Sequence, residues 1–217
     1  MNLGELRALA RMKLDDLVAP YLWSDEFLDD AINRAQDEAF VRIGGVSDDY
    51  TPQMTKAMLL AGTPTIALDQ NVLKVEAVTA GLVPLVATTV AELALITIGW
   101  EAVTGVPAKY IADATSVRVF PIPLVDIPVT MQIRRGALTR LTNDLQKPEI
   151  PYSLHNALLH FVLAEAYDIP DADIMNQDAA DRHMKAFEGV FGPRPSAKFQ
   201  SVWAKTPARS AALMRRM

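Results

Sequence analysis

The chain has 217 residues, of which 50% are hydrophobic and 22% charged, so it can bury a core without a disulfide or a metal. It has no cysteine, which excludes disulfides, thiolate metal sites and cysteine nucleophiles. Its net charge of −5 is unevenly spread. Residues 1–191 hold all 26 acidic and 15 of the 21 basic residues (−11), whereas residues 192–217 hold six basic residues and no acidic one (+6). An acidic body disfavours nucleic acid, and a basic tail favours an acidic partner surface.

Membrane insertion is not expected. The most apolar stretch, residues 82–98, contains Pro84 and Glu92 and falls short of the roughly 20 apolar residues that span a bilayer. The first residues carry a charge every few positions, with no basic region followed by an apolar run, so we expect no signal peptide.

Two helices are predicted first. Residues 3–17 have apolar side chains at helical spacing, and Pro20 ends that pattern. Ser24 is a good N-cap for a second helix, and Gly44-Gly45 stops it. Residues 46–64 are mixed, with a short helix expected near 53–60.

The spacing of apolar residues then changes to every second position. Alternation at residues 73–77, 117–119 and 129–133 predicts strands, with a turn at Gly81 and residues 83–89 pairing back. A short helix is expected at 90–95. These segments predict a small antiparallel β unit.

Helical spacing returns at Pro151. Residues 152–167 are apolar on nearly every face, which indicates a helix at the centre of the bundle or against another subunit. A last helix is expected at 172–191, stopped by Gly192-Pro193. The remaining residues, with Trp203 among cations, are interpreted as an extended arm that orders on a partner.

The predicted fold is therefore α+β and mainly α: an antiparallel helical bundle with an inserted small antiparallel β subdomain and an extended C-terminal tail. The expected parts are N-terminal bundle helices at 1–62, a β-rich insertion at 63–136, C-terminal bundle helices at 137–191, and the basic tail at 192–217.

A search for chemistry finds no phosphate-binding loop, nucleophile elbow or metalloprotease motif. His155 and His160 are five residues apart, which is not the zinc spacing, and packed or interface histidines explain them better. Asp168, Asp171 and Asp173 can bind a hard cation, but an inter-helix loop with an N-cap aspartate is the simpler interpretation. We expect no catalytic residue, no metal and no cofactor, and hence no enzyme.

Three stretches resemble the head-to-tail adaptor (connector) proteins of tailed bacteriophages. They are the two N-terminal helices around Leu-Trp-Ser-Asp-Glu-Phe at 22–27, the β segment from Gly105 to Pro123, and the C-terminal helices from Pro148 to Phe191. The resemblance covers most of residues 1–191. It implies a structural protein that forms a ring, typically of twelve copies, under the portal, extends the DNA channel and offers a platform to the next neck or tail protein. In several such adaptors the C-terminal part reaches the portal. The protein would lie in the virion neck, after assembly in the cytoplasm of the bacterial host.

Candidate residues follow for each surface. The portal-binding tail comprises Phe199, Trp203, Arg209, Leu213, Met214, Arg215 and Arg216. The subunit-interface candidates are Leu154, Leu158, Phe161, Val162 and Tyr167. The aspartate pairs Asp29, Asp30, Asp48 and Asp49 are either solvated helix faces or, in a ring, carboxylates that face the channel and keep passing DNA from sticking.

Two alternatives remain open at this point. One is another neck or tail-completion protein whose tail binds a tail component. The other is a regulatory module that uses its basic tail on nucleic acid, which the −11 body disfavours.

Overall fold

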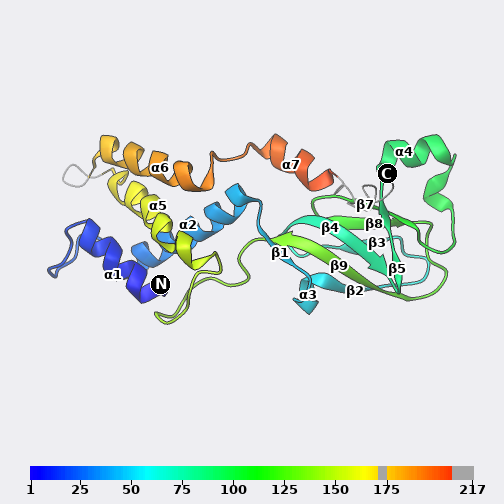
Figure 1. Cartoon of the computed structure of the whole chain (residues 1–217), viewed down its shortest axis with the longest axis horizontal. Coiled ribbons are helices and arrows are strands. Elements are labelled where there is room, and N and C mark those ends of the chain that lie inside the picture. The colour runs from blue at the N-terminus through cyan, green and yellow to red at the C-terminus, as the bar shows by residue number, and fades with distance from the viewer. Residues whose placement is uncertain (171–174, 207–217) are drawn as a thin grey trace, which may run out of the picture. The chain divides into compact units, whose positions relative to one another are not determined.

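A computed structural model of the chain describes residues 1–170 and 175–206 (Figure 1). The chain divides into two compact units. The helical unit comprises Met1–Val46 and Gly136–Pro195, and the sheet unit comprises Ser47–Arg135 together with the described residues from Ser196 onward.

The helical unit is built from helices whose ends are set by capping residues. They are α1 (Leu3–Lys13), α2 (Asp25–Ile43), α5 (His155–Tyr167), which follows the 3-10 turn η2 (Tyr152–Leu154), and α6 (Gln177–Phe191). Asn2 caps α1 in a reciprocal pair of hydrogen bonds with Glu5. Ser24 caps α2, and Gly44 ends it in the left-handed conformation at φ 71°, as the sequence predicted.

The core of this unit surrounds α5, which contacts α1, α2 and α6. Its largest fully buried side chains include Phe40, Phe187, Leu158 and Leu163. The apolar side chains on nearly every face of α5 are therefore covered largely by three helices of its own unit.

The sheet unit holds a five-stranded and a four-stranded sheet. In the first, β1 (Val46–Asp48) and β2 (Lys56–Leu59) both pair with β9 (Ile127–Arg135), which pairs with β4 (Val72–Ala80) and through it with β5 (Val83–Pro84). The second runs β3 (Thr65–Ala67), β8 (Ser116–Phe120), β7 (Lys109–Ala112) and β6 (Val86–Ala87), with β6 parallel to β7. The chain passes from one sheet to the other at Leu85, whose amide donates to Val78 while the next amide donates to Ala108.

Short helices complete the sheet unit. They are α3 (Pro52–Thr55), α4 (Val90–Ile96), the 3-10 turn η1 (Trp100–Ala102) and α7 (Ala197–Lys205). α7 contacts β4 and β7, and Ser196 caps it by accepting a hydrogen bond from the Phe199 amide.

The predicted mainly helical fold with a small β insertion is wrong. Two sheets fill a unit comparable in length to the helical one. Several strands have only two to four residues, too short for alternation to reveal them, and the expected helix at 53–60 is one helical turn followed by β2. Register shifts in β4 bury Val72, Val75 and Val78, so its apolar positions do not simply alternate.

The predicted extended tail is also wrong for residues 197–205, which form α7. The basic composition of this segment suggested an extended arm that orders on a partner. However, Ser196 caps a helix in which Ala204 is buried and Trp203 is partly buried beside Lys74 of β4, while Phe199 and Val202 stay exposed.

Candidate functional site

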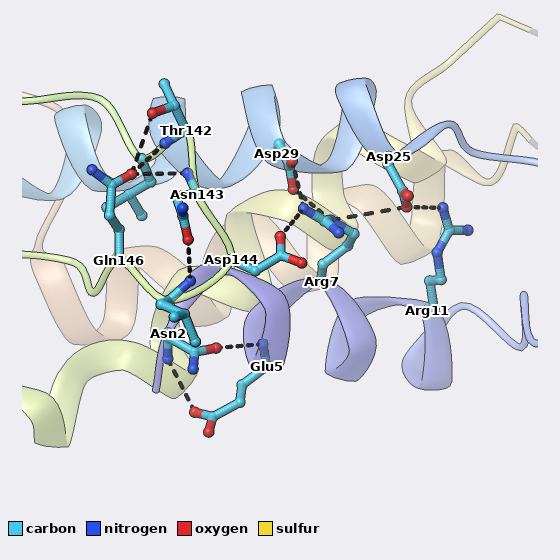
Figure 2. Close-up of polar contacts among 12 residues, drawn as sticks. Asn2, Glu5, Arg7, Arg11, Asp25, Asp29, Thr142, Asn143, Asp144 and Gln146 are labelled. Carbon is cyan, nitrogen blue, oxygen red and sulfur yellow. Dashed lines mark hydrogen bonds and ion pairs between the residues drawn. The ribbon is translucent and has the colours of Figure 1, made fainter.

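The most elaborate polar cluster of the helical unit joins α1 to α2 (Figure 2). Arg7 and Arg11 lie four residues apart on α1, and Asp25 and Asp29 lie four apart on α2. Arg7 donates from Nε and Nη2 to the two oxygens of Asp29, both at 2.7 Å, and Arg11 donates from Nη2 to Asp25 at 2.6 Å. The two helices are thus cross-linked by charge-assisted hydrogen bonds at matching intervals.

Each arginine also holds one loop. Arg7 Nη2 donates to Asp144 at 2.7 Å, and Arg11 Nη1 donates to the buried Asp16 at 2.6 Å. Hydrogen bonding to Asp29 raises the pKa of Arg7, and the bond from Arg11 lowers the pKa of Asp25. Arg7 and Asp25 therefore stay ionised near neutral pH.

The loop that Arg11 holds comprises residues 14–23 and is named the Tyr21 loop. Asp16 accepts hydrogen bonds from the amides of Leu22 at 2.9 Å and Trp23 at 3.4 Å, and the Arg11 guanidinium carbon lies 3.8 Å from the centre of the Tyr21 ring. These contacts fix the backbone while four apolar side chains stay exposed: Leu17, Val18, Tyr21 and Leu22. A rigid loop that exposes an aromatic and three aliphatic side chains has the character of a protein-binding surface.

The second loop, residues 136–151, has no helix or strand but is held at many points. Its carbonyls at Asp144 and Gln146 accept hydrogen bonds from the first amides of α1, and Asn33 of α2 exchanges two hydrogen bonds with Leu141. The Gln146 side chain accepts from two loop amides (Figure 2). Leu145 is exposed, so this loop also displays an apolar side chain from a fixed backbone.

A second apolar surface lies on the sheet unit. Only Leu93 anchors α4 inside, while Val90, Leu95, Ile96 and Ile98 are exposed, Ile98 at 99%. The sequence between Lys74 and Glu101 has two charged residues, Glu76 and Glu92. A surface with so few charges suits an apolar protein partner.

The four aspartates proposed to face a channel have different surroundings. Asp29 is occupied by Arg7, and Asp30 pairs with Arg34 and Arg140. Asp48 is buried in the sheet unit, where Arg135 Nε donates to it at 2.5 Å. Burial alone would raise the pKa of Asp48, but hydrogen bonds from Thr51 and Arg135 outweigh burial and hold it well below the usual range. Asp49 is exposed.

Asp48 therefore has a structural role in this conformation, because its carboxylate has no exposed surface to offer a channel.

The interface candidates on α5 are also divided. Leu158 and Val162 are fully buried in the core of their own unit, so they present no surface to another copy in this conformation. Leu154, Phe161 and Tyr167 are partly buried and pack against that same core.

Within the predicted tail, Phe199 is 60% exposed on α7. Trp203 is partly buried, and the Lys74 ammonium lies 4.8 Å from its ring centre. The remaining tail candidates lie outside the described residues: Arg209, Leu213, Met214, Arg215 and Arg216.

Sequence reasoning missed the arginine network. The matching four-residue spacings of Arg7 with Arg11 and of Asp25 with Asp29 were a usable signal, but nothing in the sequence connects Arg7 to Asp144, 137 residues away. The Tyr21 loop was treated only as the end of a helix.

Within residues 1–170 and 175–206, no group of three or more histidine, aspartate or glutamate side chains is placed to hold a metal ion. No helix among those residues is long and apolar enough to cross a membrane.

A family comparison defines the class of the protein. Residues 1–211 match the model of a family described as the SU10 adaptor protein. The chain belongs to the SU10 adaptor protein family and is thus a phage adaptor, a component of the virion that binds other phage structural proteins. No curated protein matches the chain.

Proposed function

We propose that this adaptor forms a ring of about twelve copies that docks on the portal, extends the DNA channel and carries the next neck or tail protein. The observation that carries the proposal is the match to the adaptor family over residues 1–211. The protein acts by assembly and catalyses no reaction in this proposal.

The surfaces of both units support an assembly role. The Tyr21 loop and the outer side of α4 expose apolar side chains from well-fixed backbones, and such surfaces on a folded chain favour protein partners. Once one contact holds a copy in the ring, its other contacts form at a high effective concentration. Many weak contacts therefore add up to a strong assembly.

The portal contact is assigned to the basic tail. Phe199 and Trp203 on α7, with Arg209, Leu213, Met214, Arg215 and Arg216, combine apolar anchors with cations in a segment that holds no acidic residue after Glu188. This composition suits an acidic portal surface with apolar pockets.

Genomic DNA passes through the ring in this proposal without specific binding. Residues 1–191 carry −11, and long-range repulsion from that body keeps the duplex from adhering. Of the four aspartates first considered for the channel wall, Asp30 and Asp49 keep exposed surface for this role.

The test is the mass in solution, by light scattering, of the full chain alone and mixed with the portal ring of its own phage. About a dozen copies added per portal would support the proposal. A folded chain that ignores the portal but binds a tail component would replace it with the tail-completion alternative.

A deletion of residues 207–217 probes the tail without removing α7. We expect the shortened chain to stay folded and to lose most of its portal binding. The matched control is Lys185→Ala, which removes one exposed cation from α6 and should leave portal binding unchanged.

A further inference from the structure

The Tyr21 loop has a charge pattern as well as an apolar surface. Asp15, Asp25 and Glu26 are exposed around Leu17, Val18, Tyr21 and Leu22, and Lys13 is exposed next to them in the sequence. Asp25 is engaged by Arg11, which leaves Asp15 and Glu26 as the carboxylates most available to a partner. The loop therefore suits a surface that offers apolar contact bordered by positive charge.

The loop geometry is already fixed before any partner binds. Arg11 holds Asp16, Asp16 holds the amides of Leu22 and Trp23, and the Trp23 indole donates to the Ala166 carbonyl at 3.4 Å. A loop ordered in advance loses little conformational entropy on association, so its exposed side chains contribute more of their burial to affinity.

The outward side of α7 has the complementary pattern. Lys198, Val202 and Lys205 occur at intervals of four and three residues, which places them along one stripe of the helix. All three are exposed, with Val202 at 59%. Lys205 pairs with Asp113 at 3.4 Å, at a site where both side chains are about half exposed.

We propose that the Tyr21 loop of one copy docks on this α7 stripe of a second copy of the chain. Asp15 and Glu26 face Lys198 and Lys205, and Val18 and Leu22 cover Val202. The two surfaces are different, so each copy uses its loop on one neighbour and its α7 on the other. Such a heterologous contact generates a closed ring when its rotation closes.

The inference deepens the proposed ring assembly and rests on it. It leaves Phe199 and Trp203, which form a separate stripe on α7, for the portal contact. The proposed contact also gives a reason for the buried ion pair between Arg11 and Asp16, which orders a loop with four exposed apolar residues. A simple connection between two helices does not require such an ion pair.

The absence of cysteine from the sequence gives a direct test. Full-length Val18→Cys and Val202→Cys chains, carrying different mass labels, are mixed at high concentration and treated with a short bismaleimide. Because each chain has one thiol, only cross-links between copies form. The matched control pairs Val18→Cys with Val125→Cys, which is similarly exposed in the loop between β8 and β9. We expect loop-to-α7 heterodimers well above the control, and an equal yield overturns the proposal.

Charge reversal gives a second readout. Glu26→Lys in the Val18→Cys chain, or Lys198→Glu in the Val202→Cys chain, should each lower the cross-link yield about tenfold, because like charges facing each other across an interface are strongly unfavourable. Combining the two reversed chains should restore the yield. If both reversals lower the yield and their combination does not recover it, the two charges do not face each other and the proposal fails.

The failures are distinguishable from those of the portal proposal. If copies gather on the portal without the cross-link, the loop-to-α7 contact is wrong and the ring stands. If the cross-link forms but no copies join the portal, the contact stands and the portal assignment is wrong.

Discussion

Arg7 and Asp29 form a bidentate ion pair with two hydrogen bonds, from Nε to Oδ1 and from Nη2 to Oδ2, each 2.7 Å long (Figure 2). The same guanidinium reaches Asp144, so one side chain joins α1, α2 and the loop at residues 136–151. A planar guanidinium with five donors suits this arrangement, whereas a lysine ammonium cannot make both parallel bonds.

Arg7→Ala should therefore destabilise the helical unit by about 1–3 kcal/mol, the range for lost hydrogen bonds to partly buried charges. Urea unfolding followed by circular dichroism measures the change. Arg34→Ala is the control, because its ion pairs with Asp30 and Glu165 are more exposed, and it should cost less than about 1 kcal/mol. Equal costs for the two variants would show that Arg7 is no more than a surface ion-pair residue.

The elements that the sequence predicted well are those with local signals. Ser24 and Gly44 bound α2 as predicted, and the alternating apolar residues at 129–133 lie in β9, the strand that pairs with β1, β2 and β4. What sequence reasoning could not find depends on distant pairing. The short edge strands acquire order from β9 and β8, and Arg7 meets Asp144 only because the chain returns to α1 after the whole sheet unit. Tertiary context decides such segments, and no local pattern marks them.

His160 and His183 give a pH prediction. Their Nδ1 atoms lie 3.0 Å apart, Tyr167 stacks on His183, and Lys13 and Arg182 are the cations nearby. Desolvation, with repulsion from Lys13, lowers the pKa of His160, and desolvation followed by repulsion from His160 lowers that of His183. At 3.0 Å the two ring nitrogens can share one hydrogen but cannot both carry one.

The folded-state pKa values lie below the unfolded value of 6.5. The neutral pair therefore stabilises the fold above pH 6.5, and this contribution is lost as the pH falls through the folded pKa values. Unfolding free energies measured from pH 7.5 to 5 should fall with pH in the wild type and fall less in a His160→Gln, His183→Gln double variant, which keeps only His155. An unchanged slope in that variant would assign the acid sensitivity to other groups.

Phe187 and Phe199 form a matched pair for testing the core. Phe187 is fully buried on α6, with its ring centre 5.3 Å from Phe161 and 4.6 Å from Phe191, whereas Phe199 is 60% exposed on α7. Phe187→Ala should cost about 3–5 kcal/mol because it leaves a cavity. Phe199→Ala should change stability by less than about 0.5 kcal/mol, and it should weaken portal binding if the tail assignment holds.

Two truncations separate the structural and binding roles of the C-terminal segment. Ala204 is buried, Trp203 is partly buried beside Lys74, and α7 contacts β4 and β7, so the helix is part of the sheet unit. Deleting residues 193–217 should lower the stability of that unit by about 1–3 kcal/mol through lost apolar burial, whereas deleting 207–217 removes none of these contacts. Thermal unfolding of both chains beside the full-length protein measures the difference. Trp203→Ala in the full chain should reproduce part of the larger loss. Equal melting temperatures for the two truncations would mean that α7 adds nothing to the sheet unit, and its side chains would then all be available to a partner.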